Sequence, residues 1–228
     1  MGNSAIIEFR NACVRADMDA VPCRNISLLA GPGDAILVST TRRGAGTPFC
    51  DAAEGLLDPL EGEVRFLGQS WRNVPPTRAA ALRARIGRVF CDPPWVSNLT
   101  VYDNLALSTR HHTCMKEAEI RTSIERLAMV CGVDAVPSGH ASTVRSDVLQ
   151  RLQWVRAFMG QPELALLEEP GEGLAGGELQ RLTQVVTHAR SEGTAVVWLT
   201  SSPDESGILS FTRRYALRDG IMSPFESD

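Results

Sequence analysis

Short, unbroken runs of apolar residues alternate along this chain with stretches in which apolar residues recur at helical spacing. An unbroken run fits a strand buried on both faces, whereas helical spacing fits a helix with one buried face. The clearest run covers residues 164–167 and leads into Glu168, Glu169 and Pro170. Because proline cannot donate to a sheet ladder, we predict a core strand that ends at Pro170 and delivers both acids to the carboxyl edge of a parallel sheet.

The same patterns predict strands and helices along the rest of the chain. Predicted strands cover residues 5–9, 25–29, 35–39, 63–67, 86–90, 194–199 and 213–217. Predicted helices cover residues 49–57, 75–85 and 177–190, and residues 100–159 are predicted to be almost wholly helical. This order of elements indicates an α/β fold with a helical insert.

Composition and charge exclude several classes of protein. The 228 residues are 43% apolar, enough for a buried core, and no apolar run approaches the ~20 residues that span a bilayer. No secretory leader is visible, and a net charge of −4 does not favour non-specific binding to nucleic acid. The six cysteines and four histidines lack ligand spacing, so we expect reduced thiols in or near the core and no metal site. Lys116 is the only lysine among 23 basic residues.

Several segments of the chain carry a recognisable pattern. They are the glycine loop at 40–48, Gly-Leu-Leu-Asp-Pro-Leu-Glu-Gly-Glu-Val at 55–64, Arg-Ile-Gly-Arg-Val-Phe at 85–90, Leu-Thr-Val-Tyr-Asp-Asn-Leu at 99–105, the strand at 162–170 and Arg-Asp-Gly at 218–220. Together they resemble the nucleotide-binding domain of ABC transporters over nearly the whole chain. The resemblance implies one P-loop NTPase-like domain over 1–228, with a mixed-sheet core from 1–92 and 160–228 and a helical subdomain at 93–159. Residues 101–113 look most like the ATPase subunit of Mla/MCE-type phospholipid transporters.

In this family the phosphate loop supplies glycine amides, a lysine for the phosphates and a hydroxyl for magnesium. Alignment on residues 55–64 puts Gly46 at the lysine position, Thr40 at the first loop glycine and Thr47 at the hydroxyl position, and Gly44 is counted with them among the degenerate positions. Arg42 or Arg43 is a possible substitute, since arginine binds phosphate in a bidentate manner.

The loop is also explained without any ligand. Thr47 is a good N-cap, Pro48 an ideal first helical residue, and Asp51 an acid that suits the first turn of a helix but repels an anion.

The resemblance places further nucleotide-site positions on residues that differ from the family's pattern. Residues 16–19 contain no aromatic side chain on which adenine could stack. Cys91 replaces the glutamine of the Q-loop, and Glu168 replaces the aspartate that orients magnesium. Ala175 replaces the aspartate of the D-loop, and Ser201 replaces the switch histidine. The signature sequence, which contacts the nucleotide on the opposite subunit, has become Val144, Arg145, Ser146, Asp147 and Val148. Glu169 alone is intact, at the position of the catalytic base.

One glutamate cannot sustain phosphoryl transfer, because positioning and charge stabilisation supply nearly all of the catalysis. We therefore expect Glu169 to be retained by packing or by hydrogen bonding near Thr200, and we expect no cofactor unless the altered site still binds ATP and magnesium. Because both the loop and the signature have changed, neither a homodimer nor a heterodimer would contain a complete site built from this chain.

The region that receives the permease in this family is better preserved. We predict a docking groove formed by Pro94, Trp95, Val96, Leu99 and Tyr102, although these residues would also suit packing between the subdomains. The main hypothesis is an inactive subunit that docks to a lipid permease at the cytoplasmic face of the bacterial inner membrane, as a homodimer or a heterodimer. The alternatives are a divergent ATPase that uses Arg42, Arg43 and Glu169, and a soluble regulatory protein with the same fold.

Overall fold

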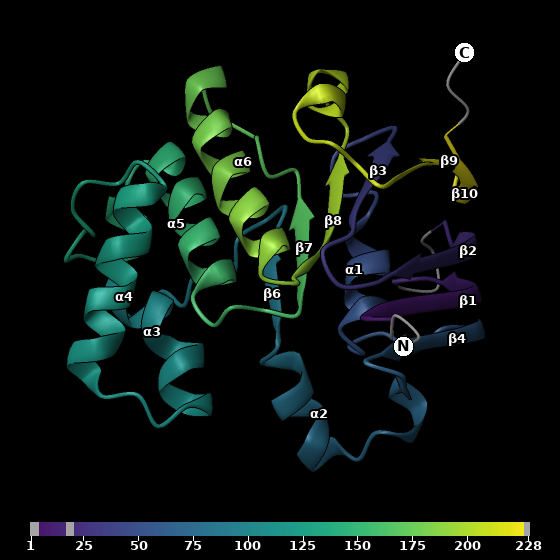
Figure 1. Ribbon diagram of the computed structural model, residues 1–228, viewed down its shortest axis with the longest axis horizontal. Coiled ribbons are helices and arrows are strands. Elements are labelled where there is room, and N and C mark those ends of the chain that lie inside the picture. The colour runs from purple at the N-terminus through teal and green to yellow at the C-terminus, as the bar shows by residue number, and fades with distance from the viewer. Residues whose placement is uncertain (1–4, 17–20, 226–228) are drawn as a thin grey trace.

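A continuous sheet runs through the part of the chain that the computed structural model describes, residues 5–16 and 21–225 (Figure 1). Its ten strands follow the order β5-β4-β1-β2-β10-β9-β3-β8-β7-β6 within these residues. The antiparallel half consists of β1 (Ile7–Val14), β2 (Cys23–Ala30), β4 (Glu61–Phe66) and β5 (Gln69–Ser70). The parallel half consists of β3 (Ala35–Thr40), β6 (Ile86–Val89), β7 (Leu164–Glu168), β8 (Ala195–Thr200) and β9 (Arg213–Arg218). Strand β10 (Ile221–Pro224) joins the halves, antiparallel to β9 and parallel to β2.

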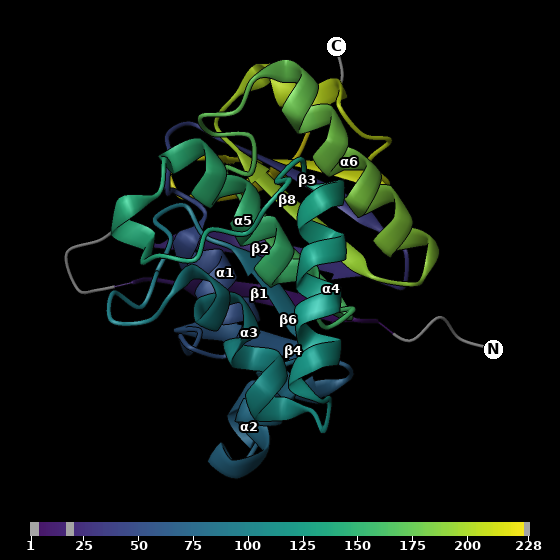
Figure 2. The ribbon, with the colours of Figure 1, turned by 90° about the vertical axis from the view of Figure 1, so that its left-hand side faces the viewer.

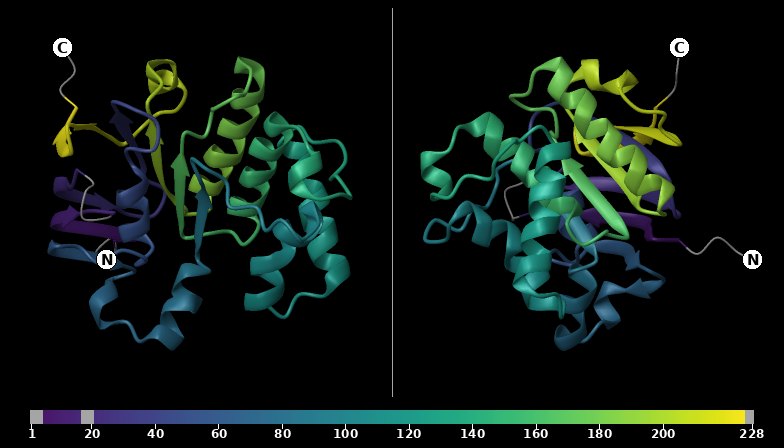
Figure 3. Two further views of the ribbon diagram at one scale, coloured as in Figure 1. Left: turned by 180° about the vertical axis from the view of Figure 1, so that it is seen from behind. Right: turned by 60° about the vertical axis from the view of Figure 1, so that its left-hand side comes forward.

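Helices cover both faces of the parallel half. Helix α1 (Thr47–Ala53) shares a core with the antiparallel strands, where Phe49 stacks on Phe9 with ring centroids 4.4 Å apart. The opposite face carries α3 (Val101–His112), α4 (Glu117–Val130), α5 (Ser146–Phe158) and α6 (Gly176–Ser191) (Figure 2). Helix α2 (Pro76–Arg83) projects from the lower end of the molecule (Figure 3). The short 3-10 helices are η1 (Trp71–Asn73), η2 (Ala141–Thr143) and η3 (Pro203–Gly207).

The central strands are apolar on both sides because each side faces a different core. Every residue of β7 and β8 is buried. Leu164 and Leu166 face the core that contains α1, whereas Ala165 and Leu167 face the core beneath the helical layer. Two-sided burial confirms the predicted α/β fold with a mixed sheet.

Some predicted boundaries were wrong, for identifiable reasons. Strand β1 continues past Phe9 because a bulge with Asn11 at φ 45° absorbs the polar interruption of the pattern. Residues 131–145 form turns and η2 instead of α-helix, in a stretch that contains Gly132 at φ 76° and Pro137. Strands β5 and β10 were not predicted, since each is only two to four residues long. Within the described residues no helix has the length and apolar character needed to cross a membrane.

Candidate functional site

Both carboxylate oxygens of Glu168, the last residue of β7, are occupied by neighbouring side chains. Its Oε1 accepts hydrogen bonds from the Arg88 guanidinium at 2.7 Å, and its Oε2 accepts one from the Thr47 hydroxyl at 2.7 Å. The Glu168 side chain is 2% exposed. The acid at the edge of the sheet therefore holds the start of α1 and the middle of β6 together.

Arg88 is a buried cation surrounded by three carboxylates. Besides Glu168, its Nη1 donates to Asp51 at 2.7 Å and to Glu54 at 2.6 Å, both on or next to α1. Burial by itself lowers the pKa of Arg88, but the surrounding acids outweigh it and raise that pKa above its ordinary value. Arg88 was missed in the sequence, although a charged residue inside an otherwise apolar strand is a visible signal.

The loop before α1 uses several of its polar groups within itself. The Thr40 hydroxyl donates to the carbonyl of Arg42 at 3.1 Å, and the amide of Ala45 donates to the same carbonyl at 3.2 Å. The amide of Thr47 donates to the carbonyl of Gly44 at 3.2 Å. These amides are therefore satisfied without a ligand.

Gly46 packs directly against β8. A Cβ atom added at Gly46 would lie 2.4 Å from Cδ2 of Leu199, a side chain that is only 2% exposed. Any side chain at this position therefore requires the end of the Leu199 side chain to move.

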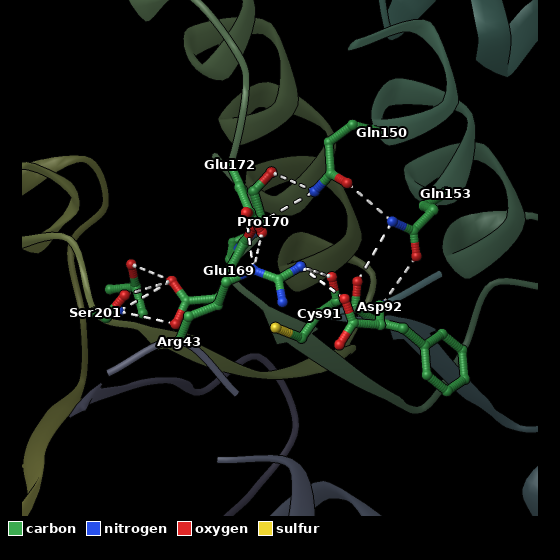
Figure 4. A network of polar contacts seen from close by, with 11 residues as sticks. Arg43, Cys91, Asp92, Gln150, Gln153, Glu169, Pro170, Glu172 and Ser201 are labelled. Atoms are coloured by element: carbon green, nitrogen blue, oxygen red, sulfur yellow. Dashed lines mark hydrogen bonds and ion pairs between the residues drawn. The ribbon is translucent and has the colours of Figure 1, made fainter. Parts of the chain in front are cut away.

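Arg43 links three segments that are far apart in the sequence (Figure 4). Its Nε donates to both oxygens of Glu172 at 2.8 Å, and its Nη2 donates to Asp92 at 2.9 Å and to the carbonyl of Cys91. Hydrogen bonds to Asp92 and Glu172 raise the pKa of Arg43 above its ordinary value. Arg42 and Arg43 are both exposed, and the Arg43 side chain is 45% exposed.

Glu169 is also fully engaged. It has φ 44°, is 8% exposed, and its carboxylate accepts hydrogen bonds from the amide and hydroxyl of Ser201 at 3.0–3.1 Å (Figure 4). The Thr200 hydroxyl donates to it at 3.4 Å, which is the hydrogen bonding near Thr200 that the sequence led us to expect. The end of β7 is thus fastened to the end of β8.

A family model described as "ABC transporter" matches residues 42–172, more than half of the chain. This chain belongs to the ABC transporter family. The structure also superimposes on an ATP-binding cassette, MJ0796, solved as a dimer in a post-hydrolysis state with ADP and Pi, with TM-score 0.85 and 17% identity over 97% of this chain and 100% of that one. At this identity the likeness shows a shared fold.

Curated relatives are transport ATP-binding proteins. The probable ribonucleotide transport ATP-binding protein mkl of Mycobacterium tuberculosis is 26% identical over 199 residues, covering 83% of this chain and 52% of the relative. The molybdenum import ATP-binding protein ModC of Pseudomonas aeruginosa is 28% identical over 188 residues, covering 78% and 49%. The chain spans about half the length of the curated relatives it matches.

The ABC phosphate-loop helix begins differently from the sequence prediction. Gly46 is the N-cap, without a side-chain cap, so Thr47 is the first helical residue and Pro48 the second. The Thr47 hydroxyl is drawn to Glu168 and does not cap the helix. Asp51 lies beyond the first turn and pairs with Arg88. Our assignments of Thr47, Pro48 and Asp51 were therefore wrong in position.

Three of the five residues predicted to be the altered signature lie with Ala175 around one shallow depression, lined by Arg145, Ser146, Asp147, Gly173, Ala175 and Glu178. Asp147, in the first turn of α5, pairs with Arg145 at 3.0 Å and with Arg151 at 3.2 Å. Burial raises the pKa of Asp147, but these arginines outweigh it, and the pKa is lowered overall. Val144 and Val148 pack against the helical core instead of facing the depression.

The predicted docking residues are spread along 94–102. Val96 is 41% exposed, Trp95 packs against the Arg156 guanidinium at 4.9 Å, and the carbonyl of Pro94 accepts a hydrogen bond from Arg156 at 3.3 Å. Leu99 is half-buried, and the Tyr102 hydroxyl donates to Glu117 at 2.9 Å. None of the five lines the cavity of about 490 Å³ that lies next to them.

Metal ligation has little support in the described residues, where no cluster of three or more His, Cys, Asp or Glu side chains is placed to hold a metal. All six cysteines are free, and Cys114 alone is exposed. Burial raises the pKa of Cys91 to about 11, so this thiol stays protonated at neutral pH. Residues 17–19 belong to the segment 16–19 that would contact adenine in the family, and they lie outside the residues that the structure describes.

Proposed function

We propose that this chain is a non-hydrolysing ABC subunit that takes neither ATP nor magnesium and acts as a scaffold for a membrane permease. In this proposal it works at the cytoplasmic face of the bacterial inner membrane, as a homodimer or with a related subunit. The transported substrate is a lipid, on the strength of the resemblance of residues 101–113 to Mla/MCE-type subunits.

The observation that carries the proposal is that the groups expected to meet a nucleotide bind one another. Arg43 is paired with Glu172 and Asp92, and the Thr47 hydroxyl is bonded to Glu168. A magnesium triphosphate would have to break these bonds before it could form its own. Glu168, which would orient the metal, is also held by Arg88, and separating a buried ion pair is strongly unfavourable.

The loop position that would contact the phosphates lacks the residue that the family uses there. A P-loop places a lysine on the β- and γ-phosphates, whereas here that position is Gly46, against Leu199. The sole lysine of the chain, Lys116, lies at the start of α4. Without the lysine and a free hydroxyl, the charge stabilisation that dominates phosphoryl transfer is missing.

A docking role is supported by apolar and aromatic side chains along residues 94–102, of which Pro94 and Val96 are exposed and Trp95 is half-buried. Val96 is exposed, and Trp95 offers a large aromatic surface of the kind that anchors interfaces. The relatives are named as transport ATP-binding proteins, consistent with a place in a transport assembly.

The test is affinity purification of the tagged chain from native membranes, with and without Mg-ATP. We expect the wild-type chain to recover an integral membrane protein in equal yield under both conditions. The Trp95→Ala variant should recover less of that protein. Phe225→Ala is the matched control, because Phe225 is an aromatic residue that is 42% exposed and is far from Trp95 in the sequence. Recovery that depends on Mg-ATP, or no integral protein at all, would refute the proposal.

A further inference from the structure

The 3-10 helix η3 is attached to the rest of the molecule through an acid. Of the five described residues of η3, Glu205 alone is buried, with 6% of its surface exposed. Apolar packing against the core of the helical layer begins only after η3, with Ile208 and Leu209. The contacts of one carboxyl group therefore decide how η3 is held.

Three neighbours surround the Glu205 carboxyl group. Its Oε2 accepts a hydrogen bond at 2.7 Å from Nε1 of Trp198, on β8. Its Oε1 packs against the loop after β7, since a Cβ atom added at Gly171 would lie 2.4 Å from it. The hydroxyl of Thr200, at the end of β8, is within hydrogen-bonding reach of the same carboxyl group. Glu205 thus joins η3 to the ends of two central strands.

The elements around Glu205 bring it no counter-charge. Strands β3 and β8, which the structure describes in full, contain no titratable side chain. In the loop after β7, Glu169 acts on Glu205 as a like charge, and Glu172 is paired with Arg43. Arg214, on β9, donates to a backbone carbonyl of η3 and not to the carboxylate. Within the described part of the chain, Glu205 is a buried acid whose charged neighbour is another acid.

The hydrogen bonds suit one ionised acid better than two. Glu169 already accepts bonds from Ser201, and a further one from the Thr200 hydroxyl at 3.4 Å (Figure 4). The Thr200 hydroxyl has a single proton, so it can donate to Glu169 or to Glu205 but not to both. Burial and the charge of Glu169 raise the pKa of Glu205, although the bonds from Trp198 and Thr200 partly oppose this.

We propose that Glu205 is a proton-dependent latch, whose neutral carboxyl group holds η3 against the ends of β7 and β8 and whose ionisation releases η3 and residues 170–174. This inference concerns regulation within the fold. It goes beyond the proposed docking function and does not depend on it.

Ionisation of Glu205 should move η3 and leave the strands in place. Every residue of β7 and β8 is buried, whereas η3 is a short and largely exposed turn. Outward movement of η3 lets water reach the ionised carboxylate and separates it from Glu169. The loop after β7 then loses the contact between Gly171 and Glu205. Because Glu172 in this loop is bonded to Arg43, the change reaches the phosphate loop.

The latch is closed at low pH. A carboxyl group whose folded-state pKa is raised adds stability that is fully present below its ordinary pKa. This contribution is lost as the pH rises through the raised value. Local opening of η3 should therefore become easier as the pH rises.

Hydrogen exchange of the full chain, corrected for the intrinsic exchange rate, measures this opening. Between about pH 5 and about pH 8, protection of residues 170–174 and 204–207 in the wild type should fall about tenfold or more. Glu205→Gln keeps a neutral group of the same shape, so its protection should change by less than about twofold. Asp204→Asn is the matched control, because Asp204 is the exposed acid next to Glu205 in η3, and it should follow the wild type.

Two outcomes of the exchange experiment would overturn the latch. One is wild-type protection of these segments that is equal at both ends of the pH range. The other is a fall in protection that persists in Glu205→Gln, which would assign the pH dependence to another group.

A second readout uses the wild-type chain and does not depend on how the variants fold. The indole N–H of Trp198 donates to Glu205, so its NMR resonance should shift as Glu205 ionises. The midpoint of that shift should lie above the ordinary pKa of glutamic acid. A Trp198 resonance that stays fixed, or that shifts at the ordinary pKa, would contradict the inference.

Discussion

Arg88 is the residue that most clearly supports the proposal that this chain takes no nucleotide. Its guanidinium pairs with Asp51, Glu54 and Glu168 from inside the sheet, at the place where the acid at the end of β7 would otherwise face a metal. The Arg88 side chain is 3% exposed, so its ion pairs are barely screened by solvent. Arg88 is thus a counter-charge from within the chain, shared by three acids.

Replacing Arg88 by methionine should lower the free energy of unfolding by about 3–5 kcal/mol at pH 7, because it leaves buried carboxylates without a counter-charge. Urea unfolding followed by tryptophan fluorescence measures the change. Arg145→Met is the control, since the Arg145 side chain is 81% exposed and its loss should change stability by about 0.5 kcal/mol or less. Equal effects of the two variants would contradict the assigned role of Arg88.

Glu54 should give the cluster a measurable pH dependence. Burial raises the pKa of Glu54, although Arg88 partly opposes this. A raised folded-state pKa means that protonation stabilises the fold, and this stability is lost as pH rises through that pKa. Lowering the pH from 7 to 5 should therefore increase the stability of the wild type relative to Glu54→Gln. A difference that stays constant or shrinks would show that the pKa of Glu54 is not raised.

At the scale of elements, the loop and α1 show how local rules give way to tertiary contacts. The sequence supports a turn followed by a helix, and the structure has both. Capping preference alone favours Thr47 as the N-cap, but the hydrogen bond from Thr47 to Glu168 moves the start of the helix to Gly46. That bond joins residues 121 positions apart, so no local pattern could reveal it.

Restoring the family's lysine should not restore nucleotide binding. The side chain of Gly46→Lys must push aside the end of the buried Leu199 side chain, so the free energy of unfolding should fall by about 1–3 kcal/mol. Chemical denaturation and titration with Mg-ATP measure the two effects. A Gly46→Lys variant that stays stable and binds Mg-ATP would contradict the proposed packing of this loop.

Arg43 should restrain its loop while adding little to global stability. Its partners Asp92 and Glu172 are 87% and 48% exposed, so Arg43→Ala should cost about 1 kcal/mol or less. Hydrogen exchange should nevertheless speed up in residues 40–46 and 91–92, because Arg43 ties these segments together. Unchanged exchange in both segments would show that the bridge does not order the loop.

At the scale of the whole molecule, the sequence predicted the fold far better than the site. Apolar runs such as 164–167 identified the core strands, since two-sided burial leaves a strong local pattern. The strand order, with β10 joining the two halves of the sheet, depends on pairings that no local pattern carries. The Arg88 cluster and the Arg43 bridge likewise depend on residues brought together from distant segments.

Calorimetric titration of the wild-type chain with Mg-ATP tests the central claim most directly, with an intact ABC cassette as the positive control. Because Arg43, Thr47, Glu168 and Glu169 are bonded to other residues, the account predicts no saturable heat up to millimolar nucleotide. Saturable micromolar binding that Arg42→Ala or Arg43→Ala abolishes would contradict it and would identify the chain as a divergent ATP-binding subunit.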